Sequence, residues 1–293
     1  MSREEVINKF IKNRSYLTNG AGSLSILWGI SKNEVKIAKA LAKERIKSRI
    51  VPTDVSNDYG DMRDSARLYL ENIRKKEIEN ILVIGDIHAP FELKGYFEFC
   101  KETYKKYNCN KVIFIGDVID CHASSYHEED PDGMSAGDEL DKAIKDVARW
   151  YKEFPVADVL IGNHDRIVMR KAFSSKIPAR WIKSYNEVLG TPGWNWSDRV
   201  VYNDVQYVHG EGGTARTKAK NDMQSTVQGH IHTQAYCEHL VGRKFRVFGL
   251  QTGCGVDGNS YAAAYAKNFK KQTIGCAVVL DNGKQPINVL MEL

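Results

Sequence analysis

The stretch Val112-Ile113-Phe114-Ile115-Gly116-Asp117-Val118-Ile119-Asp120 decides how the rest of the chain is interpreted. A short, mostly β-branched run that ends in Gly-Asp is typical of a buried strand that delivers a carboxylate to the loop at its carboxyl end. In open α/β sheets, ligands bind at that edge. A lone Gly-Asp more often closes an ordinary turn. The functional interpretation therefore depends on the motifs found elsewhere in the chain.

The composition is that of a soluble globular protein. The chain has 293 residues, of which 42% are hydrophobic and 27% charged, and this length allows about two domains. Its apolar runs are strand-sized, so we expect no membrane span, and a charged amino terminus argues against a signal peptide. Six scattered cysteines without a Cys-x-x-Cys pair indicate neither a structural zinc site nor a disulfide framework. These features predict a cytoplasmic protein.

The first 50 residues have the outline of a helix-turn-helix domain. Ser-x-x-Glu capping boxes begin helices at Ser2 and Ser31, and a short apolar helix and a glycine turn lie between them. The last helix carries apolar residues on one face and positive residues on another, which suits contact with DNA. The candidate DNA-binding residues are Lys32 and Asn33 for base edges, and Lys36, Lys39 and Lys43 for the backbone. The alternative is a solvated basic helix in a small packing domain.

The remainder of the chain divides into a connection and a larger domain. Residues 51–77 predict a linker followed by a polar helix, and residues 78–293 form the larger domain. From residue 81 to residue 189 predicted strands and helices alternate, which indicates right-handed βαβ units. From residue 199 onward the pattern changes to short strands separated by turns. The expected fold class is α/β with two sheets.

Polar residues of matching kinds follow five of the predicted strands. They occur in Gly85-Asp86-Ile87-His88, Gly116-Asp117-Val118-Ile119-Asp120, Gly162-Asn163-His164-Asp165, Tyr207-Val208-His209-Gly210 and Gly229-His230-Ile231-His232. Each motif alone is weak, because a lone histidine is more often structural than a ligand. Together they contain five of the eight histidines. Mixed oxygen and imidazole ligands at one sheet edge suit borderline divalent metals.

This series of motifs resembles the calcineurin-like metallophosphoesterase family. The resemblance covers roughly residues 81–250 and implies a four-layer α-β-β-α sandwich. It implies two divalent metal ions, with Mn²⁺ favoured and Fe, Zn, Ni or Mg as alternatives. The first metal would be held by Asp86, His88, Asp117 and His232, and the second by Asp117, Asn163, His209 and His230.

The resemblance also implies a mechanism. Two cations bridged by Asp117 would polarise the phosphoryl oxygens and activate a bound water as hydroxide for in-line attack. His164 would protonate the leaving group or stabilise the developing charge, and Asp165 would orient the His164 ring. Asp120 would not bind a metal itself but would form a hydrogen bond with a ligand histidine or with a metal-bound water.

One departure from the family pattern concerns the substrate. Protein phosphatases of the superfamily carry arginines that clamp a dianionic monoester where this chain has Cys121 and Ile161. Their absence favours phosphodiesters. Arg166 could substitute as a clamp or form a surface salt bridge, and the polar segment 121–137 adds His122 and His127 as candidate substrate contacts. That segment is equally consistent with an ordinary surface excursion.

We therefore expect a phosphodiesterase or nuclease with nucleic acid, in particular DNA, as substrate or ligand, and no membrane partner. One alternative is a phosphomonoesterase on a nucleotide or phosphoprotein. Another is a DNA-binding module whose metal site is structural or regulatory. The architecture is also similar to that of phosphoesterases carried by phage genomes, which would place the protein in the host cytoplasm. The sequence carries no signal for the oligomeric state.

Overall fold

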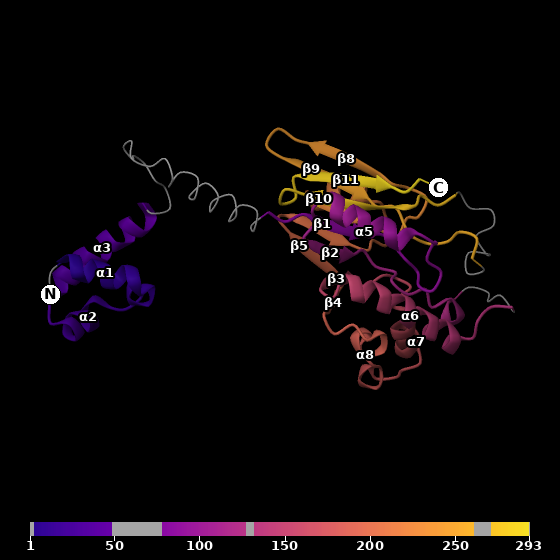
Figure 1. Ribbon diagram of the computed structural model, residues 1–293, viewed down its shortest axis with the longest axis horizontal. Helices are drawn as coiled ribbons and strands as arrows, with labels where there is room; N and C mark the ends of the chain where they lie inside the picture. Colours follow the sequence, from indigo (N-terminus) through magenta and orange to yellow (C-terminus); the bar gives the residue numbers. More distant parts are fainter. Residues whose placement is uncertain (1–2, 49–77, 127–131, 261–270, 293) are drawn as a thin grey trace. The chain divides into compact units, whose positions relative to one another are not determined.

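The computed structural model describes residues 3–48, 78–126, 132–260 and 271–292 (Figure 1). The chain divides into two compact units, Met1–Ile73 and Arg74–Leu293. The linker and helix expected over residues 51–77 lie outside the described residues. Within the described parts of the chain, no helix combines the length and the apolar character needed to cross a membrane.

The amino-terminal unit contains the expected helices in the expected order. They are α1 (Arg3–Lys12), a 3-10 turn η1 (Arg14–Leu17), α2 (Ala21–Trp28) and α3 (Lys32–Ser48). Gly29 ends α2 in the left-handed conformation, with φ 61°, which glycine adopts without steric cost. The three helices bury a common apolar core, to which Phe10, Leu24 and Val35 contribute.

A six-stranded sheet forms the first layer of strands in the larger unit. Its order is β11-β10-β1-β2-β3-β4. Four strands are parallel, namely β1 (Ile81–Ile84), β2 (Lys111–Phe114), β3 (Ala157–Leu160) and β4 (Trp194–Ser197). Two antiparallel strands, β10 (Gly275–Leu280) and β11 (Gln285–Leu290), extend the sheet beyond β1.

Three helices cover the outer face of this sheet. They are α5 (Tyr96–Lys106), α6 (Ala136–Glu153) and α8 (Tyr185–Leu189), and their buried residues share one core with the sheet. Trp150 of α6 is fully buried there and packs edge-on against Phe114 of β2, with ring centroids 5.6 Å apart. Burial of such large aromatic side chains is the main stabilisation of this layer.

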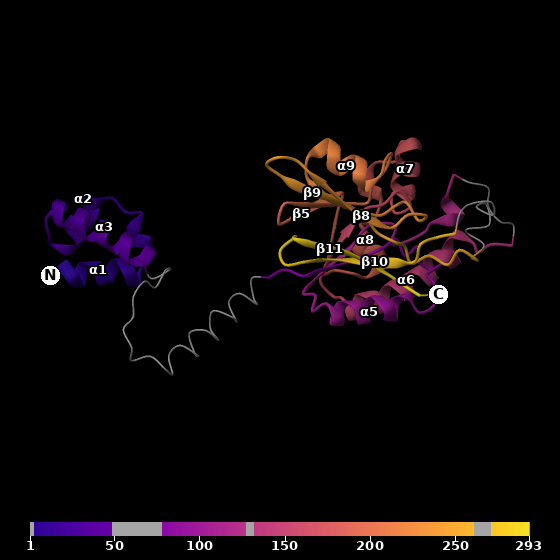
Figure 2. The same cartoon turned by 90° about the horizontal axis from the view of Figure 1, so that it is seen from above.

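A five-stranded sheet forms the second layer of strands. Its order is β5-β6-β7-β9-β8, with β5 (Arg199–Tyr202), β6 (Val205–Val208), β7 (Ser225–Gln228), β8 (Tyr236–Val241) and β9 (Arg246–Gln251). Strands β6, β7 and β9 run parallel. Helix α9 (Ala215–Asp222) packs on β7 and β9, on the side of this sheet away from α5 and α6 (Figure 2).

The two sheets pack face to face, and the alternation of side chains along each strand produces this arrangement. In β1, Ile81 and Val83 enter the core between the sheets, whereas Leu82 and Ile84 face the helices. The predicted four-layer α-β-β-α sandwich is therefore confirmed. The carboxyl ends of β1, β2, β3, β6 and β7 carry the loops that contain the five motifs.

Candidate metal centre

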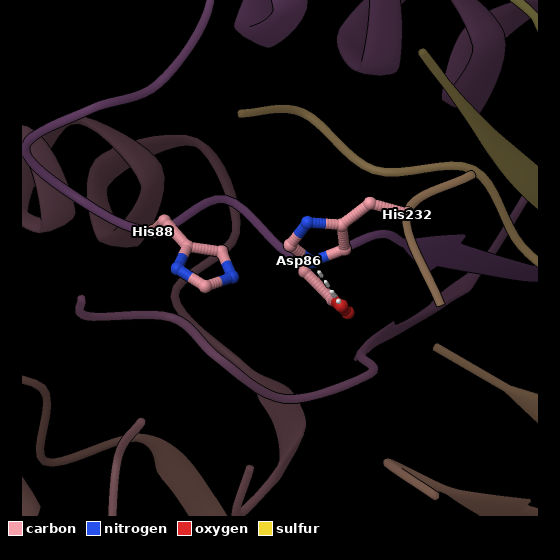
Figure 3. Close-up of side chains that lie close together, drawn as sticks. All are labelled: Asp86, His88 and His232. Carbon is pink, nitrogen blue, oxygen red and sulfur yellow. Dashed lines mark hydrogen bonds and ion pairs between the residues drawn. The ribbon is translucent and has the colours of Figure 1, made fainter. Parts of the chain in front are cut away.

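The loops after β1 and β7 supply the first group of candidate ligands, namely Asp86, His88 and His232. Asp86 and His88 are buried, at 1% and 3% exposed. Oδ2 of Asp86 lies 3.0 Å from Nε2 of His232 and accepts a hydrogen bond of 2.7 Å from the backbone N–H of His230. Figure 3 shows the Asp86 carboxylate next to the His232 ring, with the His88 ring on the other side of His232. The three ligand atoms lie close enough together to hold one ion.

The loops after β2, β3, β6 and β7 supply a second group. Asp117, His209 and His230 form another cluster with ligand atoms within reach of one ion. Nε2 of His209 lies 3.2 Å from Oδ2 of Asp117 and 3.0 Å from Oδ1 of Asn163. All four residues predicted for the second metal are thus brought together, although their β-strands belong to both sheets.

Asp117 lies between the two groups. Its Oδ2 atom is 3.6 Å from Nε2 of His88 in the first group and 3.2 Å from Nε2 of His209 in the second. Its other oxygen, Oδ1, accepts a hydrogen bond of 2.8 Å from the backbone N–H of His164. A carboxylate fixed at this position can contact two ions at once.

Two buried atoms in the centre have unused bonding capacity. Among the described residues, neither Oδ1 of Asp86 nor Nε2 of His88 has a hydrogen-bond partner. Leaving a buried polar atom unsatisfied costs about 1–3 kcal/mol, so such atoms call for an explanation. An imidazole nitrogen and a carboxylate oxygen are both good ligands for a borderline divalent cation. The residues present therefore fit a divalent metal site.

Hydrogen bonds behind the histidines leave the opposite ring nitrogens facing the centre. Nδ1 of His88 lies 2.5 Å from Oδ1 of Asp120, and Nδ1 of His209 lies 3.1 Å from the carbonyl oxygen of Ile115. A metal-binding histidine commonly donates its other N–H to a carboxylate or backbone carbonyl in this way. This contact supports the prediction that Asp120 bonds to a ligand histidine.

The charges of the centre favour a bound cation. Burial raises the pKa of the Asp117 carboxyl, but His209 and His88 outweigh this effect and hold the pKa below its usual range. Burial lowers the pKa of His209, yet Asp117 and Asp86 raise it to about 9. The carboxylates that attract a proton to His209 would equally attract a metal ion in its place.

The His164 ring is oriented by Asp120 and not, as we expected, by Asp165. Nδ1 of His164 lies 2.7 Å from the carbonyl oxygen of Asp120 and 3.3 Å from its Oδ1 atom. The buried Asp165 carboxylate instead accepts hydrogen bonds from the backbone N–H groups of Val118 and Ile119, each 3.1 Å long, and from that of Gly162. Asp165 therefore ties the loop after β2 to the loop after β3.

Glycine is required where the loops approach one another most closely. A Cβ atom on Gly162 would lie 2.1 Å from Oδ1 of Asp117, far inside contact distance. A Cβ atom on Gly116 would lie 2.4 Å from Nδ1 of His209, and this glycine also has a φ of 112°. The glycines that precede the ligands thus allow side chains from neighbouring loops to converge.

Two of the three candidate substrate contacts, Arg166 and His122, make other contacts in the structure. Arg166 forms ion pairs with Glu211 and, at 2.7 Å, with Asp198, which is the salt-bridge alternative considered for it. His122 is buried, at 5% exposed, and its backbone N–H donates a hydrogen bond to Glu139, so its side chain is not exposed to a substrate in this structure. His127 lies outside the described residues.

Glu139 is a residue that sequence analysis missed. Its carboxylate accepts hydrogen bonds of 2.7 and 2.8 Å from the backbone N–H groups of His122 and Ala123. It therefore holds the turn that follows Asp120. Nothing in the sequence indicates that Glu139 contacts that turn. It lies in the first turn of helix α6, where an acidic residue is usually exposed and interacts with the helix dipole.

In the amino-terminal unit, the positive residues of α3 differ in their surroundings. Lys32, Asn33, Lys36 and Lys43 are exposed. Lys39 is half-buried and its Nζ donates a hydrogen bond of 2.8 Å to the carbonyl oxygen of Asn19.

A two-sheet α/β sandwich with acidic and histidine side chains gathered at the strand ends is an arrangement suited to a metal-dependent hydrolase. The sequence model of the calcineurin-like phosphoesterases matches residues 79–243, which is more than half of the 293 residues. The chain belongs to the calcineurin-like phosphoesterase family and is a metal-dependent phosphoesterase.

The solved structures that match this chain are only distantly similar to it. Vacuolar protein sorting 29 from Cryptosporidium parvum is 14% identical, with a TM-score of 0.41, over 74% of this chain and 92% of that chain. The Vps29 structure from Chaetomium thermophilum is 10% identical, with a TM-score of 0.35, over 73% of this chain and 95% of that chain. No curated protein matches the sequence.

Proposed function

We propose that this phosphoesterase uses two divalent metal ions to hydrolyse phosphodiester bonds, and that its substrate is nucleic acid. The observation that carries the two-metal assignment is the position of Asp117, whose Oδ2 atom lies between Nε2 of His88 and Nε2 of His209. One metal would be held by Asp86, His88, Asp117 and His232. The other would be held by Asp117, Asn163, His209 and His230. When bound, the cations would supply positive charge against the phosphoryl oxygens and would acidify the attacking water.

His164 is the proposed general acid. Its side chain is 19% exposed, so a substrate can reach it, and its ring centroid lies 4.5 Å from that of His88. Burial lowers the pKa of His164, but the hydrogen bond to Asp120 and the charge of Asp117 raise it to about 10. The raised pKa favours the protonated ring, which can donate its proton to the leaving alkoxide. Asp120 is a positioning residue for this step.

The preference for diesters rests on the charges available to the substrate. A monoester dianion carries more charge than a diester and needs an additional cationic clamp. The phosphatase-type arginine positions are Cys121 and Ile161. Burial raises the pKa of the Cys121 thiol to about 12, so this residue is neutral. Arg166 is engaged with Asp198 and Glu211.

A substrate panel tests this proposal. We would load the full-length protein with Mn²⁺ and compare hydrolysis of a chromogenic diester, a chromogenic monoester, and single- and double-stranded DNA. Asp117→Asn and His164→Ala should lower diester hydrolysis by at least about 100-fold. Cleavage of the monoester alone would show a phosphomonoesterase. Two bound metals without any hydrolysis would favour a structural or regulatory metal site.

The proposed DNA contact by α3 is tested separately. Lys36→Gln combined with Lys43→Gln should reduce the slope of log K against log salt for duplex DNA by about 1.8, since each phosphate contact contributes about 0.9. Lys12→Gln, an exposed lysine at the end of α1, is the control. An unchanged slope in the double variant would contradict a role of α3 in DNA binding.

A further inference from the structure

Helix α7 and the turn after it expose an unusual number of large apolar side chains. Helix α7 spans Ile167–Ser174, and the 3-10 turn η3 that packs on it spans Ala179–Trp181. Phe173 is 84% exposed and Trp181 is 78% exposed. Val168, Met169 and Ile177 are also exposed. Large exposed apolar side chains gathered on one helix and the turn after it indicate an interaction site.

The same segment is uniformly positive. Residues 166–183 contain six arginines and lysines and no acidic residue. Arg166 is paired with Asp198 and Glu211, but the other five form no ion pair with any described residue. They are Arg170, Lys171, Lys176, Arg180 and Lys183. We call this exposed set, together with Phe173 and Trp181, the α7–η3 surface.

The surface contains a groove and a further aromatic ring. The groove has a volume of about 390 Å³ and is lined by residues that include Arg166, Met169, Phe173 and Ile177. The guanidinium of Arg170 lies 5.2 Å from the centre of the Tyr126 ring, and Nζ of Lys171 lies 5.4 Å from it. Tyr126 itself is 59% exposed. Cations and exposed rings are thus interleaved.

The α7–η3 surface is joined directly to the metal centre. The backbone N–H of Ile167, the first residue of α7, donates a hydrogen bond of 3.0 Å to the carbonyl oxygen of His164. Arg166, which lines one part of the groove, pairs with Glu211, two residues beyond His209. Eight helical residues span about 12 Å, so a chain bound along α7 would extend a short distance from the proposed general acid.

We propose that the α7–η3 surface binds a single-stranded stretch of nucleic acid next to the cleaved bond. This inference rests on the proposed function and specifies its substrate. Single-strand binding proteins combine a positive groove, which follows the phosphates, with exposed rings, on which unpaired bases stack. Phe173 and Trp181 supply such rings, and the five cations supply the charge. A duplex keeps its bases stacked inside the helix and cannot use these rings.

Binding of a defined oligonucleotide tests the proposal. We would use full-length protein loaded with Mn²⁺ and a fluorescent 20-nucleotide thymidine strand with phosphorothioate linkages, and measure affinity by anisotropy. Trp181→Ala and Phe173→Ala should each weaken binding on the order of 5- to 150-fold, the range for one lost base-stacking contact. Phe245→Ala removes another exposed ring, at 43% exposed, from the β8–β9 hairpin and should change affinity less than about twofold.

Charge neutralisation provides a second test that does not depend on the aromatic residues. Lys176→Gln combined with Arg180→Gln should lower the salt slope by about 1.4, since each single-strand phosphate contact contributes about 0.7. Lys105→Gln combined with Lys106→Gln, on α5, is the matched control. A 4-thiothymidine strand should form its photocrosslinks within the peptide that contains Phe173 or Trp181.

Any one of three results would overturn the proposal. The first is that the Trp181, Phe173 and Phe245 variants bind the single strand with equal affinity. The others are that a duplex binds as tightly as the single strand and is weakened equally by Trp181→Ala, or that a polyglutamate peptide of similar charge competes as well as an unlabelled single strand. The proposed function fails independently, and differently, if the loaded protein does not hydrolyse a small chromogenic diester. In that case, sensitivity of single-strand binding to Trp181→Ala would still support the surface.

Discussion

Asp120→Asn tests whether a carboxylate that is not itself a proposed metal ligand supports the ligand His88 and the general acid His164. Asp120 is 5% exposed, and its Oδ1 atom lies 2.5 Å from Nδ1 of His88 and 3.3 Å from Nδ1 of His164. Asparagine keeps the size of the side chain and one acceptor oxygen but removes the negative charge. His88 would become a weaker ligand, and the pKa of His164, now about 10, would fall towards its ordinary value.

Loss of a carboxylate behind a ligand histidine typically costs 10- to 100-fold in metal affinity, which is about 1.4–2.7 kcal/mol. We would titrate Mn²⁺ by calorimetry and measure diester hydrolysis at saturating Mn²⁺. The variant should bind Mn²⁺ at least about tenfold more weakly and remain slower even when saturated, because His164 has lost its orienting charge.

Asp158→Asn is the matched control for this substitution. Asp158 is also a buried carboxylate, at 9% exposed, but it lies within β3 and bonds to Tyr202 and Asn195. Its variant should lose stability and retain metal affinity. If Asp120→Asn and Asp158→Asn bound Mn²⁺ equally well, the assigned role of Asp120 would be refuted.

Three further outcomes are expected. Gly162→Ala should lower Mn²⁺ affinity at least about tenfold, because the new Cβ atom would displace Asp117. Gly22→Ala is the control and should leave the affinity unchanged, because its Cβ atom would meet no atom within 4 Å. Equal Mn²⁺ affinities of the two variants, measured by calorimetry, would contradict this prediction. Chelation should lower the melting temperature by about 5 °C or more, as a ligand at 100 times its Kd stabilises by about 2.7 kcal/mol; an unchanged calorimetric transition would count against a bound metal. Metal binding should release protons below about pH 9, because the His209 ring is protonated in this range when no metal is bound, and metal affinity should therefore rise with pH up to about 9. Calorimetry in buffers of different ionisation enthalpy measures the proton release. If no proton were released at pH 7.5, His209 would not be a metal ligand that is protonated in the metal-free protein.

The sequence predicts those strands and helices that have a clear hydrophobic pattern. The buried strands Ile81–Ile84 and Val205–Val208 have the predicted bounds, because the first is an apolar run followed by Gly85 and the second begins directly after the turn residues Asn203-Asp204. Strand β4 was missed, since Trp194–Ser197 is short and half polar. Its place in the sheet comes from pairing with β3, which is a tertiary effect.

Helix α9 shows a different limit of sequence analysis. Ala215–Asp222 is almost entirely polar, and its only buried residues are Ala215 and Ala219. The helix can still pack because Gly249 of β9 leaves room, since a Cβ there would lie 2.8 Å from the Ala215 backbone. One local signal was present: Thr214 caps the helix by accepting a hydrogen bond from the backbone N–H of Thr217.

The candidate metal ligands could be predicted from the sequence, because their residue types and spacing form recognisable motifs. The hydrogen-bond partners of the site residues could not, because tertiary packing determines them. The strand-end motifs predicted that these side chains converge, and the resemblance to the calcineurin-like family implied the place of Asp117 between two groups of ligands. The partner of the His164 ring was wrong, because Asp165 is adjacent in sequence but its carboxylate is taken up by backbone N–H groups. Local sequence cannot show that competition.

The two-metal assignment is tested most directly by locating the ions. Crystals of the full-length protein grown with Mn²⁺ would be measured at the manganese absorption edge. We predict two anomalous peaks roughly 3.5–4 Å apart, one beside His88 and His232, the other beside His209 and His230, with Asp117 bound to both. A single peak, or two peaks that do not share Asp117, would contradict the account.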